Sequence, residues 1–399
     1  MANILISSLG TGDRTKGYRD AKYEYNGEIK ETKVISKALT EFFDIDKLYL
    51  VGTNGSYWDN CYVNFGGEDE EYELGLYEKI VSKSLTHGDL DELCKTIDKY
   101  TQTDGTTCFL IEYGKNDKEL WNNFEKYLTI LDEINDDDIL YIDITHSFRS
   151  LALMSFLMVQ FGQVIKNKKF KIGGILYGMF EYSYENDGIS LIVDLKIFYD
   201  LMEWIKAIDA FKNYSRTDSI ERLLLNDENI HKITTETFKG FDINISFANM
   251  VSLKKFIGKA KQSLAVLKDS KSPIVKLLSG DIVDFIQRLD HKDISRFQLE
   301  LTKWYFENKN YALAFLVLAE AIVSKECENL AYDVQNQESR NEAKKKLYDR
   351  RFKSDEGKVS YTISRIRNTI AHQIEKEIDI SDEVASFSEY LLVAEEFIV

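Results

Sequence analysis

The chain has 399 residues, with 51 lysines and arginines against 67 aspartates and glutamates, so its formal net charge is −16. This length predicts two domains, and an apolar fraction of 44% with 13% aromatic residues excludes wholesale disorder. The four cysteines are scattered without a C-x-x-C pair, which argues against a disulfide scaffold or a zinc site and favours a reducing cytoplasm. Taken as a total, the acidic charge argues against broad nucleic-acid binding through a basic surface.

The chain is expected to lack targeting and membrane segments. It starts with a strand-like run that has no basic residues before it, which is not the pattern of a signal peptide. The longest apolar run, residues 151–159, is too short to cross a bilayer. A cytoplasmic protein without a membrane span is therefore predicted.

The first two hundred residues alternate short β-rich runs with helical patterns. The predicted strands are residues 3–9, 47–51, 107–113, 139–145 and 171–177. The predicted helices are residues 32–43, 77–100, 118–134 and 147–164, and the last is apolar nearly all round, which predicts a buried helix. Continuous apolar runs separated by helices are typical of a parallel sheet that is covered on both faces. The pattern predicts a doubly wound, Rossmann-like α/β domain with a parallel sheet.

One insertion interrupts this alternation after the first strand. No helix starts after Gly10-Thr11-Gly12, and residues 22–29 alternate around Asn26-Gly27, which predicts a β-hairpin. The dinucleotide-binding fingerprint needs a helix directly after its glycines, so a dehydrogenase is disfavoured. The chain also contains no G-x-x-x-x-G-K-[ST] motif, which disfavours a P-loop NTPase.

From about residue 195 the apolar residues recur with the period of a helix up to the end of the chain. The only proline, Pro273, follows a polar stretch and predicts a helix start. The second half is therefore predicted to be an all-α domain. We place the domains at residues 1–198 and 199–399, with residues 199–215 as a connecting helix.

The most specific motif is Arg367-Asn368, followed by His372. These residue types suit RNA cleavage without a metal, in which a 2′-hydroxyl attacks the adjacent phosphorus. His372 can transfer protons near neutral pH, Arg367 can stabilise the charged transition state, and Asn368 can orient the histidine. The alternative is an ordinary polar helix turn that contains a histidine.

The spacing of the three residues bears on how a site is built. Asn368 lies four residues before His372, on the same face of a helix. Arg367 lies five residues before it, so one helix poorly assembles both side chains. Two copies of the motif at a dimer interface would resolve this.

The motif Arg-Asn-x-x-x-His on a late helix of an all-α domain resembles the HEPN ribonucleases. The helical stretch 310–322 is similar to the core helix of that fold. The N-terminal half resembles the CARF domain, through residues 7–12 after the first strand and residues 143–150 after the fourth. Together these likenesses suggest a CRISPR type III accessory ribonuclease. In that family the CARF domain binds cyclic oligoadenylate and the HEPN domain cuts RNA, with a 2′,3′-cyclic phosphate product expected.

The loops after the strands also predict a binding site without the resemblance, since ligands of open α/β sheets bind outside the carboxyl ends of the strands. The glycines allow a phosphate to approach the backbone, and Thr145 or Ser147 can cap the following helix. For Arg149, a phosphate contact and a pair within the domain stay open, and for His146 a structural role stays open. The expected ligand-binding residues are Ser8, Gly10, Thr11, Gly12, Asn54, Thr145, His146, Ser147 and Arg149.

No metal site is predicted, because the acidic runs 68–71 and 136–138 lack the spacing of a calcium loop. The first hypothesis is a cyclic-oligoadenylate-activated, metal-independent endoribonuclease that acts on single-stranded RNA as a homodimer or higher homo-oligomer. The resemblance favours cyclic tetra-adenylate over cyclic hexa-adenylate, and no other cofactor is expected. The alternatives are a non-catalytic CARF sensor and a CARF ring nuclease that degrades its ligand.

The distribution of charge changes the meaning of the acidic total. Residues 340–367 hold ten lysines and arginines against four acids, a balance of +6. Residues 373–399 hold eight acids against one lysine, a balance of −7. The net charge therefore conceals a basic stretch that leads to Arg367, and RNA binding is not excluded.

Overall fold

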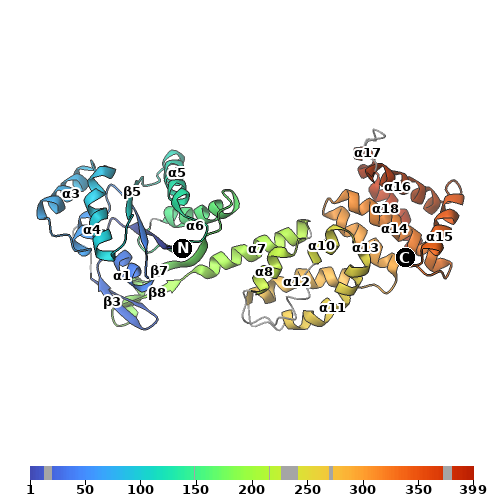
Figure 1. Cartoon of the computed structure of the whole chain (residues 1–399), viewed down its shortest axis with the longest axis horizontal. Coiled ribbons are helices and arrows are strands. Elements are labelled where there is room, and N and C mark those ends of the chain that lie inside the picture. The colour runs from blue at the N-terminus through green and yellow to red at the C-terminus, as the bar shows by residue number, and fades with distance from the viewer. Residues whose placement is uncertain (13–19, 148, 215, 226–240, 269–272, 372–379) are drawn as a thin grey trace. The chain divides into compact units, whose positions relative to one another are not determined.

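The computed structural model describes residues 1–12, 20–147, 149–214, 216–225, 241–268, 273–371 and 380–399 (Figure 1). The chain forms two compact units, Met1–Asp200 and Leu201–Val399. Each unit has its own hydrophobic core.

The N-terminal unit contains one sheet of eight strands in the order β3-β2-β8-β7-β6-β1-β4-β5. The strands are β1 (Asn3–Leu9), β2 (Ala21–Tyr25), β3 (Glu28–Thr32), β4 (Lys47–Thr53), β5 (Thr107–Ile111), β6 (Ile139–Asp143), β7 (Lys171–Gly178) and β8 (Ile189–Asp194). The five predicted strands are present and pair in parallel as β7, β6, β1, β4 and β5. The predicted α/β domain with a mainly parallel sheet is thus confirmed.

The sheet is not parallel throughout, which corrects the prediction. Strand β8, which the sequence pattern missed, runs antiparallel to β7, because the connection between them is too short for a crossover helix. The predicted hairpin is present as β2–β3, with Asn26 and Gly27 at φ 52° and 85°, and β2 pairs in parallel with β8. The inserted hairpin therefore extends the sheet at one edge.

Helices cover both faces of this sheet (Figure 1). They are α1 (Ile35–Phe42), α2 (Trp58–Asn64), α3 (Glu70–Ser82), α4 (Asp91–Thr101), α5 (Asp117–Glu133) and α6 (Arg149–Val164), with 3₁₀ turns η1 (His87–Leu90) and η2 (Glu181–Glu185). Leu5 and Leu9 of β1 pack towards helices α1 to α4. Ile4 and Ile6 point to the other face and pack with residues of α5 and α6.

Two predicted helices of this unit differ in detail. The helix expected over residues 77–100 is broken, because Lys83 ends α3 in the left-handed conformation and Thr86 forms a capping box with Asp89 that starts a new turn. Helix α6 is buried on one side only: Leu151 is covered by the sheet, whereas Leu153 and Leu157 are 68% and 60% exposed in the single chain. The apolar composition of α6 thus exceeds what its own unit buries.

Within the described residues, the C-terminal unit contains helices and no strand. They are α7 (Lys196–Tyr214), which begins in the first unit, α8 (Asp218–Leu225), α10 (Phe241–Ser246), α11 (Met250–Lys268), α12 (Pro273–Arg288), α13 (Ile294–Glu307), α14 (Tyr311–Asn329), α15 (Gln337–Asp349), α16 (Asp355–Ala371), α17 (Ile380–Ala385) and α18 (Phe387–Ile398). Pro273 is the first residue of α12, as predicted. Helix α14 is buried on most of its surface, because α13, α15, α16 and α18 all pack against it. None of the described helices combines the length and apolar composition that crossing a bilayer requires.

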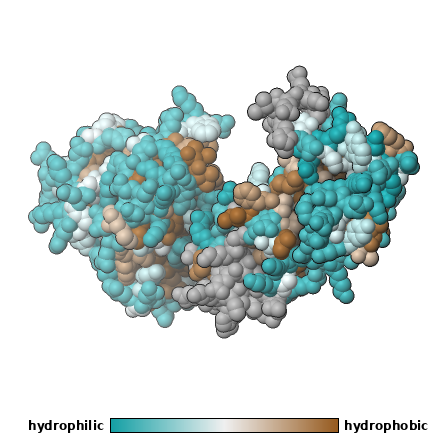
Figure 2. Space-filling model, turned by 45° about the vertical axis from the view of Figure 1, so that its right-hand side comes forward, coloured by the Kyte–Doolittle hydropathy of each residue, from teal (hydrophilic) through white to brown (hydrophobic). Residues whose placement is uncertain are grey.

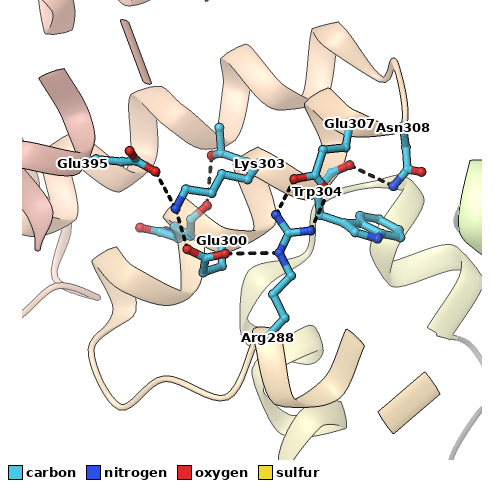
Figure 3. Close-up of polar contacts among 9 residues, drawn as sticks. Arg288, Glu300, Lys303, Trp304, Glu307, Asn308 and Glu395 are labelled. Atoms are coloured by element: carbon cyan, nitrogen blue, oxygen red, sulfur yellow. Dashed lines mark hydrogen bonds and ion pairs between the residues drawn. The ribbon is translucent and has the colours of Figure 1, made fainter. Parts of the chain in front are cut away.

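A group of charged side chains ties α12, α13 and α18 together (Figure 3). The Arg288 guanidinium lies 3.1 Å from Glu300 and 2.5 Å from Glu307, and the Lys303 ammonium lies 2.7 Å from Glu300 and 2.5 Å from Glu395. Burial raises the pKa of Glu300, but the hydrogen bonds from Lys303 and Arg288 outweigh it, so the pKa is lowered. Glu300 thus stabilises the fold in its ionised form.

Replacing Glu300 with glutamine is therefore expected to destabilise the protein by about 1–3 kcal/mol at pH 7, because two cations lose a charged acceptor. A lowered carboxyl pKa gives stability that is present above the ordinary value and is lost as the pH falls through the folded value. Thermal unfolding of the full chain at pH 7 and near pH 3 measures this. The loss should shrink at the lower pH, and Glu396→Gln, an exposed glutamate on α18, serves as the control. An equal loss at both pH values would contradict the assignment.

Candidate functional site

The carboxyl ends of β1 and β6 meet at the point where the strand order reverses. From β1 the chain continues to β4 and β5 on one side, and later to β6 and β7 on the other. The loops after β1 and β6, which start at Gly10 and Ile144, leave the sheet at the same edge. This is the position where open α/β sheets bind ligands.

Asp143 holds this edge together. Its carboxylate is buried at the end of β6, and it accepts hydrogen bonds from the Ser7 hydroxyl at 2.5 Å and from the Thr145 backbone N–H at 2.9 Å. Burial raises the pKa of Asp143, and the hydrogen bonds from Ser7 and Thr145 lower it in part. The carboxylate therefore fixes the loop after β6 against β1.

Thr145 is fixed by its side chain as well. Its hydroxyl accepts a hydrogen bond from the Gly178 backbone N–H at 2.8 Å, which joins the loop to the end of β7. A Cβ on Gly178 would lie 2.6 Å from the Cδ1 atom of Ile35 and 3.3 Å from the Thr145 methyl group, so a larger residue there would have to displace these side chains. The Thr145 hydroxyl thus bonds to β7, a contact that the sequence did not suggest.

His146 and Ser147 lie partly buried in the same loop. Burial lowers the pKa of His146, and the charges of Asp143 and Glu181 oppose this only in part. The imidazole is therefore neutral at neutral pH and offers a hydrogen bond rather than a positive charge. Arg149 is the first residue of α6, and its side chain lies outside the described part of the structure.

The loop after β1 is held by the segment that follows β4. The Ser56 hydroxyl donates to the Leu9 carbonyl at 2.7 Å, and the Tyr57 N–H donates to the Gly10 carbonyl at 3.1 Å. Gly12 has φ +52°, and a Cβ there would lie 2.1 Å from the Tyr57 ring. Gly12 thus meets both a conformational and a steric requirement for glycine.

The remaining expected ligand-binding residues lie around these loops. A Cβ on Gly55 would be 3.7 Å from the Thr11 methyl group, so Thr11 lies beside the loop that carries Asn54. The Asn54 Oδ1 atom is buried and has no hydrogen-bond partner in the described part of the chain. Ser8 is only 6% exposed and is covered in the single chain. The structure thus gathers the predicted residues at one edge of the sheet.

The helical unit carries the second candidate site on α16. Arg367 is partly exposed, and its Nη1 atom lies 3.4 Å from the Oε1 atom of Glu320 on α14. Asn368 is exposed on the last turns of the same helix. His372 follows the end of α16 and lies outside the described residues. The structure therefore places two of the three predicted catalytic residues.

Glu320 is a functional candidate that the sequence did not single out. Its carboxylate also binds the Arg340 guanidinium, which in turn donates to the Ser324 hydroxyl and the Val334 carbonyl at 3.1 Å each. Glu320 thus holds Arg340 and Arg367 on two neighbouring helices. The signal in the sequence is a single carboxylate within residues 311–323, which are otherwise apolar, whereas the last turns of α14 are polar.

A cavity of about 680 Å³ lies beside this carboxylate. Residues of α11, α13, α14 and α15 line it, and Lys254, Lys255 and Arg340 make part of its wall positive. In the described residues, no group of three or more histidine, cysteine, aspartate or glutamate side chains is arranged to hold a metal ion.

Comparisons with known proteins show what each unit is similar to. Residues 4–181 match the family model of the CARF domain of the CRISPR system endoribonuclease Csx1. Over these residues the N-terminal unit is therefore similar to a CARF domain of the Csx1 kind. Residues 200–294 match the second domain of the CRISPR-associated protein MJ1674, so the first helices of the C-terminal unit, up to the start of α13, correspond to that domain.

Nearly the whole chain is similar to one curated protein. The CRISPR-associated protein MJ1674 of Methanocaldococcus jannaschii is 32% identical over 402 residues, which cover 93% of this chain. The chain spans 62% of the length of that relative. Among solved structures, Enterococcus italicus Csm6 bound to cyclic hexa-2′-fluoro-hexa-dAMP is similar with a TM-score of 0.46 and 11% identity, over 100% of this chain and 94% of that one.

Gly12→Ala is expected to destabilise the N-terminal unit more than Gly27→Ala. Both positions need a positive φ, which costs an alanine about 1–2 kcal/mol. A Cβ meets no atom within 4 Å at Gly27, whereas at Gly12 it forces the Tyr57 ring to move, which adds about 1–3 kcal/mol. Thermal unfolding of the two variants measures the difference, and equal midpoints would contradict the tight contact at Gly12.

Proposed function

We propose that this protein is a metal-independent endoribonuclease of type III CRISPR defence that cyclic oligoadenylate activates and that cleaves single-stranded RNA. The observation that carries the proposal is Arg367, held by Glu320 and followed by Asn368, at the end of α16 where His372 comes next. The match of residues 4–181 to the CARF domain of a CRISPR endoribonuclease supports the proposal that this unit binds cyclic oligoadenylate as an activator of RNA cleavage. The helices from α13 onward would then form the HEPN part.

Each of the three residues has a defined task in the reaction. His372 moves a proton at the attacking 2′-hydroxyl or at the leaving 5′-oxygen. Arg367 stabilises the negative charge that grows on the non-bridging oxygens of the phosphorus, and Glu320 orients its guanidinium for this task. Asn368 orients the imidazole. The bond between phosphorus and the 5′-oxygen breaks as the 2′-oxygen bonds to phosphorus, which leaves a 2′,3′-cyclic phosphate.

At the CARF edge, the glycine loop after β1 and the loop after β6 would bind the activator. Backbone N–H groups around Gly10 and Gly12 can approach a phosphate, and the neutral His146 and the buried Asn54 amide can bind a base or ribose. The preference for cyclic tetra-adenylate over cyclic hexa-adenylate stays a prediction.

A homodimer through α6 would complete the ligand site of the N-terminal unit. Leu153, Leu157 and Val164 form an apolar stripe that is 59% to 68% exposed in the single chain, whereas much of the visible surface is hydrophilic (Figure 2). Helix α6 starts directly after the loop of Thr145 to Ser147. A second copy on this stripe would bring two sets of ligand loops together, which suits a symmetric ring.

The catalytic assignment predicts that Arg367→Ala and His372→Ala each lower RNA cleavage by about 10²- to 10⁴-fold. Cleavage of a labelled single strand is measured in EDTA, with and without cyclic tetra-adenylate and cyclic hexa-adenylate. Arg222→Ala, which changes an exposed arginine on α8, should cleave normally. Full stimulated activity in His372→Ala would refute the assignment. Degradation of the cyclic oligoadenylate without cleavage of the RNA would favour a ring nuclease.

The dimer assignment predicts that Leu153→Glu with Leu157→Glu yields a monomer that does not respond to cyclic oligoadenylate. Two charges on the stripe would have to be buried without partners, which costs several kcal/mol. Native mass spectrometry gives both the oligomeric state and the number of bound rings. Leu74→Glu, at an equally exposed leucine on α3, is the control and should leave the dimer intact. A dimeric double variant would contradict the interface.

A further inference from the structure

Three aromatic side chains and two arginines form one surface on α15, α16 and the turn between them. This aromatic surface consists of Tyr348, Arg351, Phe352, Tyr361 and Arg365. The Tyr348 and Tyr361 ring centroids are 6.0 Å apart, and those of Phe352 and Tyr361 are 6.4 Å apart. The Arg351 guanidinium lies 3.9 Å from the Tyr348 ring centroid and 4.6 Å from that of Phe352, and the Arg365 guanidinium lies 5.9 Å from that of Tyr361.

The fold does not need these rings in its core. The helices are anchored from their other side by Leu347 and Ile363, which are 1% and 0% exposed. Tyr348 and Phe352, in contrast, are 51% and 73% exposed. Large aromatic groups on the surface leave apolar area in water, and their grouping with arginines indicates a binding surface.

The net charge around the aromatic surface is positive. Lys344 and Lys345 lie four and three residues before Tyr348, on the same side of α15, and both are exposed. Two of the four acids in residues 340–367 lie near cations, since Asp355 is 3.4 Å from Lys358 and Glu356 is 3.5 Å from Arg350. The other two, Glu342 and Asp349, are exposed, and the ten lysines and arginines outnumber all four. The surface therefore combines ring faces with cations that can bind phosphates.

The aromatic surface is continuous with the candidate catalytic residues. Tyr361, Arg365 and Asn368 lie at positions i, i+4 and i+7 of α16, on one face of the helix. Seven residues of helix correspond to a rise of about 10 Å. A strand that is bound across the rings can thus reach the end of α16 within a few nucleotides.

We propose that the aromatic surface is the subsite that stacks the bases of single-stranded RNA beside the phosphate that is cleaved. Bases stack on Phe352 and Tyr361, while Arg365, Lys344 and Lys345 bind the backbone phosphates. Single-stranded RNA is the occupant that uses both properties, because its bases offer flat faces and its backbone repeats a negative charge. An acidic peptide would use the charges only. This inference rests on the proposed function for the position of the cleaved phosphate.

The test is binding and cleavage of a fluorescent single-stranded RNA by Phe352→Ala and Tyr361→Ala. We expect each variant to weaken RNA binding by about tenfold, as loss of one stacked base does. The KM for RNA should rise by the same factor, while kcat at saturating RNA and the binding of cyclic oligoadenylate stay unchanged. Phe352→Trp should bind RNA as well as the wild type does, because tryptophan also offers a ring on which a base can stack. A merely structural role of Phe352 does not predict this result. Tyr214→Ala, at a 71% exposed tyrosine on α7, is the matched control.

The salt dependence of RNA binding distinguishes the phosphate contacts of the subsite from its stacking contacts. The loss in Arg365→Ala should shrink between 50 and 300 mM salt, because phosphate contacts are screened, whereas the loss in Phe352→Ala should persist. Duplex RNA, whose bases are paired, should bind the wild type and Phe352→Ala equally. Polyglutamate that competes as well as single-stranded RNA would overturn the proposal, as would unchanged RNA affinity in both aromatic variants.

The outcomes distinguish this inference from the proposed function. If the wild type cleaves RNA and His372→Ala does not, but Phe352→Ala and Tyr361→Ala keep the wild-type KM, only the stacking subsite is wrong. If the wild type does not cleave RNA but binds it, and Phe352→Ala weakens that binding, the nuclease function is wrong and the subsite stands.

Discussion

A carboxylate buried away from water must be hydrogen-bonded, and the buried carboxylate of Asp143 meets this requirement at the edge of the N-terminal sheet. Asp143 accepts from Ser7 on β1 and from the backbone of Thr145, so it joins the two strands at which the strand order reverses. Because Thr145 is bound in turn to Gly178 of β7, three strands position one loop. The loop that carries His146 and Ser147 is thereby tied to three strands, and such hydrogen bonds reduce the entropy that a loop loses on binding a ligand.

The helical unit uses the same device at its second candidate site. Helix α14 is apolar and central, yet it carries Glu320 and Glu326, whose carboxylates bind arginines from α15 and the turn after it. Glu326 is almost fully buried and binds the Arg350 guanidinium with both oxygens, at 3.2 and 2.8 Å. Glu320 binds Arg340 and leaves its second oxygen for Arg367. The ion pairs that dock α15 on α14 therefore also orient the residue that we assign to transition-state stabilisation.

Surfaces that the fold leaves uncovered complete this picture. The apolar stripe of α6 and the aromatic surface of α15 and α16 both lie on helices whose opposite sides are fully buried. Neither is required by its own unit for packing, so the chain can use them for association without loss of stability. The first suits a second copy of the chain because it is apolar, and the second suits a polyanion because it carries cations between its rings.

The sequence by itself predicted most elements of the N-terminal unit and named the loops that the structure brings to one edge of its sheet. Continuous apolar runs identified the five parallel strands, and Asn26-Gly27 identified the hairpin, because these signals are local. The sequence reading missed the break in the helix over residues 77–100, because the apolar pattern continues through it. The break comes from Lys83, which turns the chain, and from the capping box of Thr86 and Asp89, which starts the next turn. Strand β8, which pairs with β7 just before it and with β2 of the inserted hairpin, was missed. The sequence placed Arg367, Asn368 and the loop of Thr145 by motif, but only the tertiary structure showed what holds them. The bonds of Asp143 to Ser7 and of Glu320 to Arg340 and Arg367 span from 20 to 136 residues of chain. Such contacts leave no periodicity in the sequence, so packing alone decides them.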